Sequence, residues 1–329
     1  MKKNLFSIIF ILSITLTFAQ NNKYWLKQSP TSESIKESRK NLPLKQTFSL
    51  DLEALKQTLS NAPERGEMRR GLGIIISFPN SEGKFERFRI FEAPVLHPEL
   101  AARYPDIKSY AGQGVDNATE RIRFSISPLG LQSMRLSADK PATFIEPYTT
   151  DLQHYTVYSR QERRADFDNF ECEVSDRASS IIDGNSAFRN ADDATLRTYR
   201  LAVSTTGEYT AYHGGTKAQA LAAINTTMTR VNGIFENDFN VTMVLIANND
   251  DVIYTSANSD PYSSGSYNSQ LQSTLTSVIG ESNYDIGHLF ARASNNGNAG
   301  CIGCVCVNGQ KGSAFTSRTD PEGDPFDVD

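Results

Sequence analysis

The residues whose types could support chemistry gather near the end of the chain, in the run Tyr284–Asp329. This run contains His288 and three of the four cysteines, Cys301, Cys304 and Cys306. Histidine nitrogen and cysteine thiolate are the ligands that structural zinc prefers, but such sites place two ligand pairs at defined spacings. No second pair follows here, and His288 lies too far upstream in an apolar stretch. We therefore expect no structural zinc in this run.

The four histidines, His97, His154, His213 and His288, do not start an HExxH motif. That motif places two zinc-binding imidazoles one helical turn apart, with a glutamate beside the first. His97 is followed by Glu99, but no second ligand lies nearby. The sequence also contains neither a GxSxG motif nor a phosphate-binding glycine loop. We expect no catalytic residue and no metal ligand in these 329 residues, and a buried, hydrogen-bonded role for His288.

The amino terminus has the composition of an export signal. Lys2 and Lys3 precede an apolar run over residues 5–18, and the chain turns polar at Gln20. We interpret residues 1–20 as a secretory signal peptide, and the alternative is an uncleaved anchor helix. No later stretch approaches membrane length. The sequence therefore predicts a secreted protein, extracellular or at the cell surface, without a membrane partner once the signal is removed.

The overall composition is that of a soluble globular protein, with 39% hydrophobic and 22% charged residues. The formal net charge is -5. A nucleic-acid partner would require a basic face, which this charge balance does not indicate. The oligomeric state is not indicated by the sequence.

Residues 49–160 are predicted to form a compact, β-rich α+β domain. Asp51 caps a short helix that ends near Pro63, and paired strand patterns follow it. The expected strands cover residues 73–78, 85–91, 121–127, 131–136, 143–145 and 155–158. Residues 21–48 lack periodicity and are interpreted as a flexible lead-in. Residues 161–194 are polar and are interpreted as a linker between domains, the alternative being a long surface loop.

Residues 195–329 show alternating strand and helix patterns. Apolar residues step by three and four through residues 217–239, which predicts a helix. The other expected elements are strands at 199–204, 241–247, 285–290 and 301–307 and a helix at 270–279. This alternation is typical of an α/β domain whose mainly parallel twisted sheet is connected by crossover helices.

Several long blocks carry a family resemblance. The first are YRLAVSTTGEYTAYHGG and AINTTMTRVNGIFENDFNVTMVLI, and YDIGHLFARASNNGNAGCIGCVCVNGQKGSAFT and GDPFDVD follow in the same order. From Leu196 onward the chain resembles the amino-terminal half of a secreted bacterial metzincin of the reprolysin-like, adamalysin-related type. The blocks RFRIFEAPVLHPELAARYPDIKSYAGQG and RIRFSISPLGLQSMRL resemble the propeptide domain of the same zinc metalloproteases.

The resemblance implies a secreted zinc-dependent metalloendopeptidase, made as a proenzyme, that acts on protein or peptide substrates. In that family, the last block leads into the zinc-binding helix HExxHxxGxxH, which these residues do not contain. The resemblance also implies one antiparallel edge strand that pairs with an extended substrate. We expect that strand at Gly300, Cys301, Ile302, Gly303 and Cys304, the alternative being an ordinary buried strand.

The end of the chain, Phe326–Asp329, reads as a strand-like run. We therefore expect a truncated catalytic domain that binds no Zn2+ by the expected motif and is inactive alone. The alternative is a non-catalytic secreted binding module, or a pseudoprotease, with a metzincin-like sheet.

Cys172 stands apart from the other cysteines, between acidic neighbours. In latent metalloproteases of this kind, a propeptide thiolate can occupy the fourth zinc position. Cys172 lies just upstream of the catalytic-like region, which suits that role. The rival interpretation is a disulfide to one of the three downstream cysteines, because thiols of exported proteins tend to pair. Four cysteines allow three connectivities, and the sequence does not choose among them.

Overall fold

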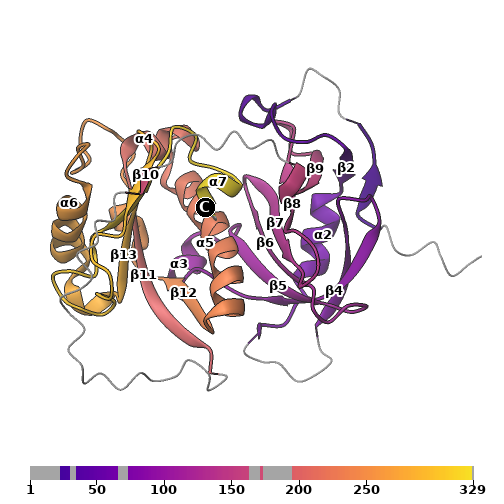
Figure 1. Cartoon of the computed structure of the whole chain (residues 1–329), viewed down its shortest axis with the longest axis horizontal. Helices are drawn as coiled ribbons and strands as arrows, with labels where there is room; N and C mark the ends of the chain where they lie inside the picture. The colour runs from indigo at the N-terminus through magenta and orange to yellow at the C-terminus, as the bar shows by residue number, and fades with distance from the viewer. Residues whose placement is uncertain (1–22, 30–34, 66–72, 163–170, 173–194, 328–329) are drawn as a thin grey trace, which may run out of the picture. The chain divides into compact units, whose positions relative to one another are not determined.

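The computed structural model describes residues 23–29, 35–65, 73–162, 171–172 and 195–327 (Figure 1). The expected signal peptide, residues 1–20, lies outside the described residues, as does most of the expected linker, residues 161–194. Among the described residues, none of the helices combines the length and the apolar character that crossing a membrane requires.

The chain divides into two compact units. Unit 1 comprises Met1–Phe91, Gly112–Arg121 and Arg135–Arg163. Unit 2 comprises Glu92–Ala111, Ile122–Met134 and Arg164–Asp329. Unit 2 therefore combines the carboxy-terminal region with two stretches that the sequence analysis assigned to the amino-terminal β-rich domain.

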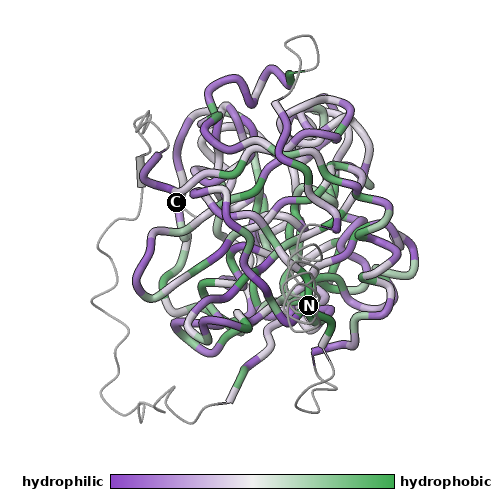
Figure 2. Tube along the Cα trace, turned by 90° about the vertical axis from the view of Figure 1, so that its right-hand side faces the viewer, coloured by the Kyte–Doolittle hydropathy of each residue, from purple (hydrophilic) through white to green (hydrophobic). Residues whose placement is uncertain are grey.

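The β-rich region forms a nine-stranded sheet, which contains all six strands that the sequence predicts there. The strand order is β1-β2-β9-β8-β7-β6-β5-β4-β3. The strands are β1 (Trp25–Lys27), β2 (Gln46–Leu50), β3 (Ile74–Pro79), β4 (Phe85–Glu92), β5 (Lys108–Gly114), β6 (Arg121–Ser127), β7 (Gly130–Leu136), β8 (Thr143–Pro147) and β9 (His154–Ser159). Figure 2 shows hydrophobic and hydrophilic stretches mixed along the described chain. Strands β6, β7 and β8 are buried along almost their whole length.

The helix predicted after Asp51 is confirmed as α2 (Leu52–Leu59). A side-chain oxygen of Asp51 accepts a hydrogen bond of 3.0 Å from the backbone N–H of Ala54, which satisfies one of the free donors at a helix start. Leu55 and Leu59 form the buried side of this helix. The strands β1, β2 and β5 and the short helix α3 (Pro98–Arg103) were not predicted.

The segment predicted as a flexible lead-in is ordered at its described residues, which corrects that expectation. Trp25 in β1 is buried and lies 5.8 to 6.4 Å, ring centre to ring centre, from Phe48, Phe78 and Tyr155. The short 3-10 helix η2 (Glu37–Arg39) follows and presents a buried arginine that pairs with Glu146 of β8. Burial of the large apolar side chain of Trp25 stabilises β1, although the sequence around it shows no hydrophobic periodicity.

The carboxy-terminal region forms a six-stranded sheet within unit 2, in the order β10-β14-β15-β13-β11-β12. Its strands are β10 (Glu171–Cys172), β11 (Arg197–Thr205), β12 (Val241–Leu245), β13 (Ile286–Ala291), β14 (Asn296–Asn298) and β15 (Ala314–Ser317). The pairs β11–β12, β11–β13 and β13–β15 are parallel, whereas β14 runs antiparallel to β15. The sheet is mainly parallel, as predicted, but its antiparallel strand is β14 and not residues 300–304, and β10 lies outside it in the sheet.

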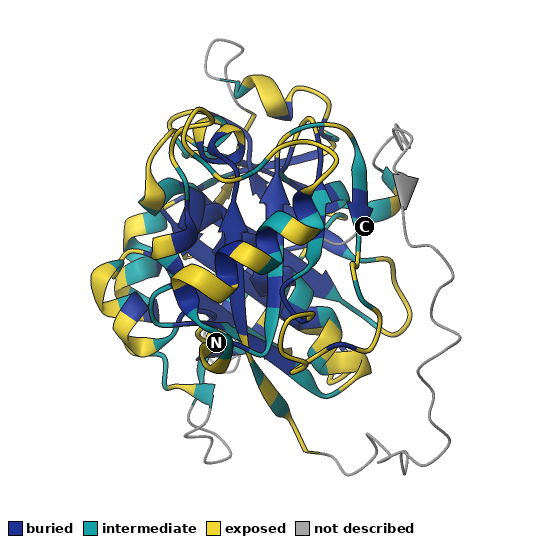
Figure 3. Cartoon of the chain, turned by 90° about the vertical axis from the view of Figure 1, so that its left-hand side faces the viewer, coloured by how far each residue is buried: buried dark blue, intermediate teal, exposed yellow. Residues whose placement is uncertain are grey.

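Helices cover both faces of this sheet. The predicted helix at 217–239 is α5 (Lys217–Asp238), and the one at 270–279 is α6 (Tyr267–Thr274), which continues as a π turn to Ile279. They lie on opposite sides of the strands in Figure 1. Leu201 and Val203 of β11 face the α5 side, and Ala202 faces the α6 side. In Figure 3 the strands are buried behind helices whose outer faces are exposed.

Two carboxy-terminal expectations were wrong. Residues 301–307 form turns rather than a strand, because the sheet continues through β14 before them and β15 after them. Phe326 and Asp327, expected in a strand-like run, lie in the short helix α7 (Asp324–Asp327), and residues 328–329 lie outside the described residues. The remaining helix of this region, α4 (Gly207–Tyr212), was not predicted.

Candidate functional site: the β14 edge of the six-stranded sheet

Strand β14 lies between two partners of opposite direction. On one side it pairs antiparallel with β15, and Gly297 lies opposite Thr316. On the other side it pairs in parallel with β10, and Cys172 lies opposite Gly297. Backbone pairing with an extended segment at a sheet edge is the mode in which many proteins bind peptides. In this chain the segment that pairs with β14 comes from the residues that precede the carboxy-terminal region.

The residues predicted as the substrate strand, Gly300 to Cys304, follow β14 and form turns instead. Gly300 has a φ of 68°, and a Cβ at this position would lie 2.3 Å from the carbonyl oxygen of Ser313. The glycine is therefore required by a turn and by close approach to Ser313. The side-chain oxygen of Asn298 accepts a 2.6 Å hydrogen bond from the backbone N–H of Gly300, which turns the chain out of the sheet.

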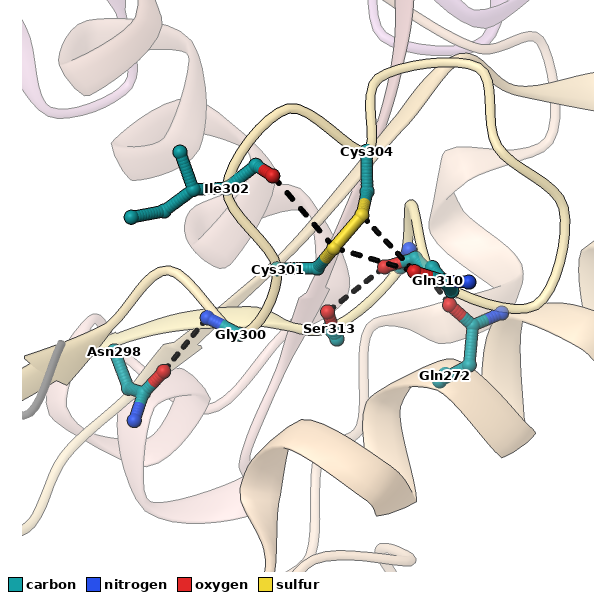
Figure 4. The surroundings of a disulfide bond; sticks show 9 residues. Gln272, Asn298, Gly300, Cys301, Ile302, Cys304, Gln310 and Ser313 are labelled. Carbon is teal, nitrogen blue, oxygen red and sulfur yellow. Dashed lines mark hydrogen bonds between the residues drawn. A yellow bond between two sulfur atoms is a disulfide. The ribbon is translucent and has the colours of Figure 1, made fainter. Parts of the chain in front are cut away.

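A disulfide between Cys301 and Cys304 closes this turn (Figure 4). The two Cα atoms are 5.6 Å apart, which is within the ordinary range for a disulfide. Both sulfur atoms lie against the side-chain oxygen of Gln310, at 3.3 and 3.1 Å. Ile302 between the cysteines is exposed. The alternation of cysteine with small and apolar residues thus arises from a disulfide-closed loop and not from the pleat of a strand.

The loop returns to the sheet along α6. The backbone N–H of Gly312 donates a 2.8 Å hydrogen bond to the side-chain oxygen of Gln272, and the hydroxyl of Ser313 donates one of 2.8 Å to the carbonyl of Gln310. These contacts hold the start of β15 on the α6 side. They also fix the position of β14, because β14 pairs with β15.

The disulfide narrows the possible role of Cys172. Because Cys301 and Cys304 are joined to each other, a tether from Cys172 to either of them does not fit this arrangement. Cys306 is exposed and has a free thiol, and its backbone N–H donates a 2.9 Å hydrogen bond to the carbonyl of Asp285. Among the described downstream cysteines, Cys306 is thus the one to which Cys172 could be linked.

His288 lies in β13, which is separated from β14 by β15. Its Nε2 is 2.9 Å from the hydroxyl oxygen of Thr316 in β15, and its ring packs against Phe290 at 5.4 Å. Desolvation by burial lowers the pKa of His288 to about 4, because burial disfavours the charged imidazolium. The hydrogen-bonded role predicted for His288 is confirmed, although its side chain is only partly buried.

The other three histidines lie on separate elements. His97 caps α3 and accepts a 3.3 Å hydrogen bond from the backbone N–H of Glu99. His213 ends α4, where its Nε2 lies 3.1 Å from the carbonyl oxygen of Pro321. His154 begins β9. In the part of the chain that the structure describes, no group of three or more histidine, cysteine or acidic side chains could hold a metal ion. The histidine, cysteine and acidic residues that the structure describes therefore do not fit a zinc site.

A buried ion pair, which sequence reasoning missed, joins α5 to α7. A guanidinium nitrogen of Arg230 lies 2.6 Å from a carboxylate oxygen of Asp327, and the two side chains are 1% and 3% exposed. The hydroxyl of Thr227 donates a 2.6 Å hydrogen bond to the other oxygen of Asp327. The signal in the sequence is an arginine inside the helix predicted at 217–239, because a charge that such a helix buries requires a partner.

The aromatic ring of Phe326 anchors α7 on the sheet. It lies 5.0 Å from the ring of Phe290 and 5.9 Å from that of Tyr209. Burial, followed by the charges of Asp327 and Glu322, raises the pKa of Tyr209. The segment that follows β15 is therefore fixed against α4, α5 and β13.

No curated protein matches the chain. Residues 195–329 match the family model described as metallo-peptidase family M12B, reprolysin-like. The match begins two residues before β11 and includes the whole of the six-stranded sheet except β10. It confirms the resemblance of residues 195–329 to reprolysin-like metallo-peptidases, a family of zinc-dependent hydrolases of proteins or peptides. The blocks that resemble the propeptide domain lie outside the match. Residues 195–329 of this chain are therefore similar to the reprolysin-like metallo-peptidases of family M12B.

Proposed function

We propose that the chain is the amino-terminal part of a secreted zinc-dependent metalloendopeptidase that is made as a proenzyme. The family match over residues 195–329 carries this proposal. Residues 1–20 are the signal peptide, residues 49–160 the propeptide domain and residues 195–329 the first part of the catalytic domain. The Cys301–Cys304 disulfide supports export, because disulfides persist in oxidising compartments.

The site of substrate binding in this proposal is the β14 edge rather than Gly300–Cys304. An extended peptide can pair with β14 through backbone hydrogen bonds, as β10 does. Because β10 already occupies that edge, residues 171–172 exclude a substrate from it in the uncut chain. This competition supports the proenzyme assignment. The exclusion of substrate by β10 requires only backbone pairing with β14. It therefore does not depend on whether the Cys172 thiol binds zinc or forms a disulfide with another cysteine.

The described residues do not supply the catalytic metal site. In this family a bound zinc ion acidifies a water molecule and polarises the scissile carbonyl. The HExxHxxGxxH sequence that binds it is absent from the 329 residues. We therefore assign to these residues the binding edge and the inhibitory segment, and we assign no proton transfer or metal ligation to them.

The first test is activity. Residues 21–329, purified and incubated with zinc and a quenched casein substrate, are expected to show no turnover and no stoichiometric zinc by elemental analysis. A version extended by the reading frame that follows the Asp329 codon is expected to gain hydrolysis that a chelator abolishes. Chelator-sensitive turnover by residues 21–329 alone would contradict the assignment of roles. A stop codon directly after Asp329 would instead favour a non-catalytic secreted binding module.

The second test is the covalent state of the cysteines in the exported protein. Mass spectrometry of the non-reduced chain is expected to find a mature amino terminus near residue 21 and a Cys301–Cys304 disulfide within one peptide. A Cys172 peptide that is alkylated without reduction supports the thiol role, and a cross-link between Cys172 and Cys306 supports the tether. A cross-link between Cys172 and either Cys301 or Cys304 would contradict the Cys301–Cys304 disulfide.

A further inference from the structure

Within unit 2, a short extended segment of the amino-terminal half adds to the outer edge of β12. The backbone N–H of Leu245 donates a 2.7 Å hydrogen bond to the carbonyl of Val95, and the N–H of His97 donates one of 3.0 Å to the carbonyl of Leu245. Leu96 lies opposite Leu245 in parallel register. Val95 and Leu96 are buried in the same hydrophobic cluster as β11 and α5. The addition therefore combines backbone pairing with burial of apolar area.

A charged cluster holds α3 beside this strand addition. The guanidinium of Arg103 lies 2.8 Å from one carboxylate oxygen of Asp250 and 3.3 Å from the other, and it also donates to the carbonyl of Ala247 at 2.7 Å. The hydroxyl of Tyr104 donates a 3.0 Å hydrogen bond to Asp250. Burial acts to raise the pKa of Asp250, but the hydrogen bonds from Arg103 and Tyr104 outweigh it and lower that pKa. Two-point contacts of this kind fix orientation as well as affinity.

The middle of α5 presents a buried polar surface to strands β5 and β6. The hydroxyl of Ser109 lies 2.8 Å from the side-chain oxygen of Asn225 and 2.9 Å from the hydroxyl of Thr229. The hydroxyls of Ser125 and Thr226 are 3.0 Å apart. Thr226 and Thr229 donate to backbone carbonyls of their own helix. Thr226 therefore accepts from the hydroxyl of Ser125, and the single hydroxyl proton of Ser109 is shared between Asn225 and Thr229.

The last turns of α5 lie close to residues of β6 and β7. The guanidinium of Arg123 donates a 3.2 Å hydrogen bond to a carboxylate oxygen of Glu236, and both side chains are nearly buried. A Cβ on Gly233 would lie 2.9 Å from Cγ of Arg123 and 3.1 Å from Cε of Met134. A glycine in the interior of a 22-residue helix costs about 1 kcal/mol relative to alanine. Here it is explained by the approach of residues 122–134.

We propose that α5 and the outer edge of β12 form a docking surface, and that its occupant is the part of unit 2 formed by residues 93–111 and 122–134 of this chain, which stays bound after the chain is cut. A cut between residues 172 and 195 then leaves a two-piece complex and not a free carboxy-terminal domain. The docking surface lies on the β12 side of the sheet, whereas the proposed substrate edge is β14 at the other end. The inference goes beyond the proposed function, since it depends on contacts within unit 2 and on no catalytic step.

The test uses the full chain with the recognition sequence of a site-specific protease inserted between Gly184 and Asn185. After complete cleavage, seen in a denaturing gel, the two pieces are expected to elute together from a native size-exclusion column. Reductant is present in one arm, so that a disulfide from Cys172 cannot join the pieces. Elution of two separate pieces in that arm would overturn the proposal. No measurement of activity is involved, so failure of the protease assignment would not affect this result.

Two variants identify the contacts that hold the pieces. Arg103→Ala removes the contacts to Asp250 and Ala247 and is expected to weaken association of the cleaved pieces by about threefold to tenfold, because this ion pair is partly exposed to solvent. The dissociation constant is measured by dilution with fluorescence detection. The matched control is Arg200→Ala, which removes an ion pair of 2.7 Å with Asp285 away from the docking surface. The control is expected to leave association unchanged. Equal dissociation constants for Arg103→Ala and the unsubstituted chain would contradict the assigned contacts.

Gly233→Ala separates docking from folding. Alanine favours the helical conformation more than glycine does, so this substitution does not weaken α5 by itself. Its methyl group meets Arg123 and Met134, and association of the cleaved pieces is therefore expected to weaken, by about tenfold as an order of magnitude for overpacking. Unchanged or tighter association would show that residues 122–134 do not dock on α5.

Discussion

At the scale of single residues, His288 shows what the sequence can and cannot give. Its neighbours in the apolar run Asp285–Phe290 predicted a structural imidazole, and its hydrogen bond to Thr316 agrees. Thr316 itself was not predicted as the partner, because the two residues belong to neighbouring parallel strands joined through a long connection. Partners of this kind are determined by strand register, which a pattern in one strand does not contain.

His288 gives a prediction for pH. Its pKa is lowered to about 4 in the folded chain, compared with about 6.5 for an unperturbed histidine. Between these values the unfolded chain binds more protons, so the free energy of unfolding is expected to fall as the pH falls from about 6.5 to about 4. Urea unfolding across that range measures this slope. His288→Gln cannot titrate and is expected to show a shallower slope, and identical slopes would contradict the desolvated environment.

At the scale of elements, long periodic segments were predicted well and short ones were not. The helix at 217–239 was found because its apolar residues repeat over many turns. Strand β14 is only Asn296, Gly297 and Asn298, which is a turn-like composition without a strand pattern. These residues are recognised as a strand only through their backbone pairing with β10 and β15. The substrate strand was therefore predicted in the adjacent apolar residues, where the disulfide forms a loop.

The junction of α5 and α7 gives a stability prediction. Asp327→Asn leaves the buried guanidinium of Arg230 without its counter-charge. Loss of one partner of a buried pair costs about 3–5 kcal/mol. We expect urea unfolding to show a loss of that order, whereas the double substitution Arg230→Met with Asp327→Leu recovers most of it, since neither charge is then buried. A matched control is Glu53→Gln, which breaks the exposed pair with Lys56 and is expected to change stability by less than about 1 kcal/mol.

Agreement of the Asp327→Asn variant with the Glu53→Gln control would show that the Arg230–Asp327 pair is not buried in solution. A double variant as unstable as the single one would show that the pair contributes through its shape and not through its charge.

At the scale of the whole molecule, the sequence predicted an amino-terminal and a carboxy-terminal region. It did not predict that residues 92–111 and 122–134 of the amino-terminal region belong to the same unit as the carboxy-terminal region. Strand patterns at 121–127 and 131–136 were recognised, yet they do not reveal that part of each belongs to unit 2. Ser109 and Asn225, which meet in unit 2, are separated by 116 positions in the chain. Such contacts need complementary polar groups on two elements, and a serine on a strand has the same pattern whichever helix it meets.

The two ends of the six-stranded sheet differ in how firmly their outermost backbone is held. At the β12 end, residues 95–97 are followed by the charged cluster around Asp250 and the polar surface of α5. At the β14 end, the described addition is the two-residue strand β10. If β10 alone is released, the backbone groups of β14 that pair with it become available for hydrogen bonding, whereas the outer edge of β12 stays paired with residues 95–97. Under the proposed function, an extended peptide then pairs with β14, whereas residues 95–97 already pair with Leu245 at the outer edge of β12.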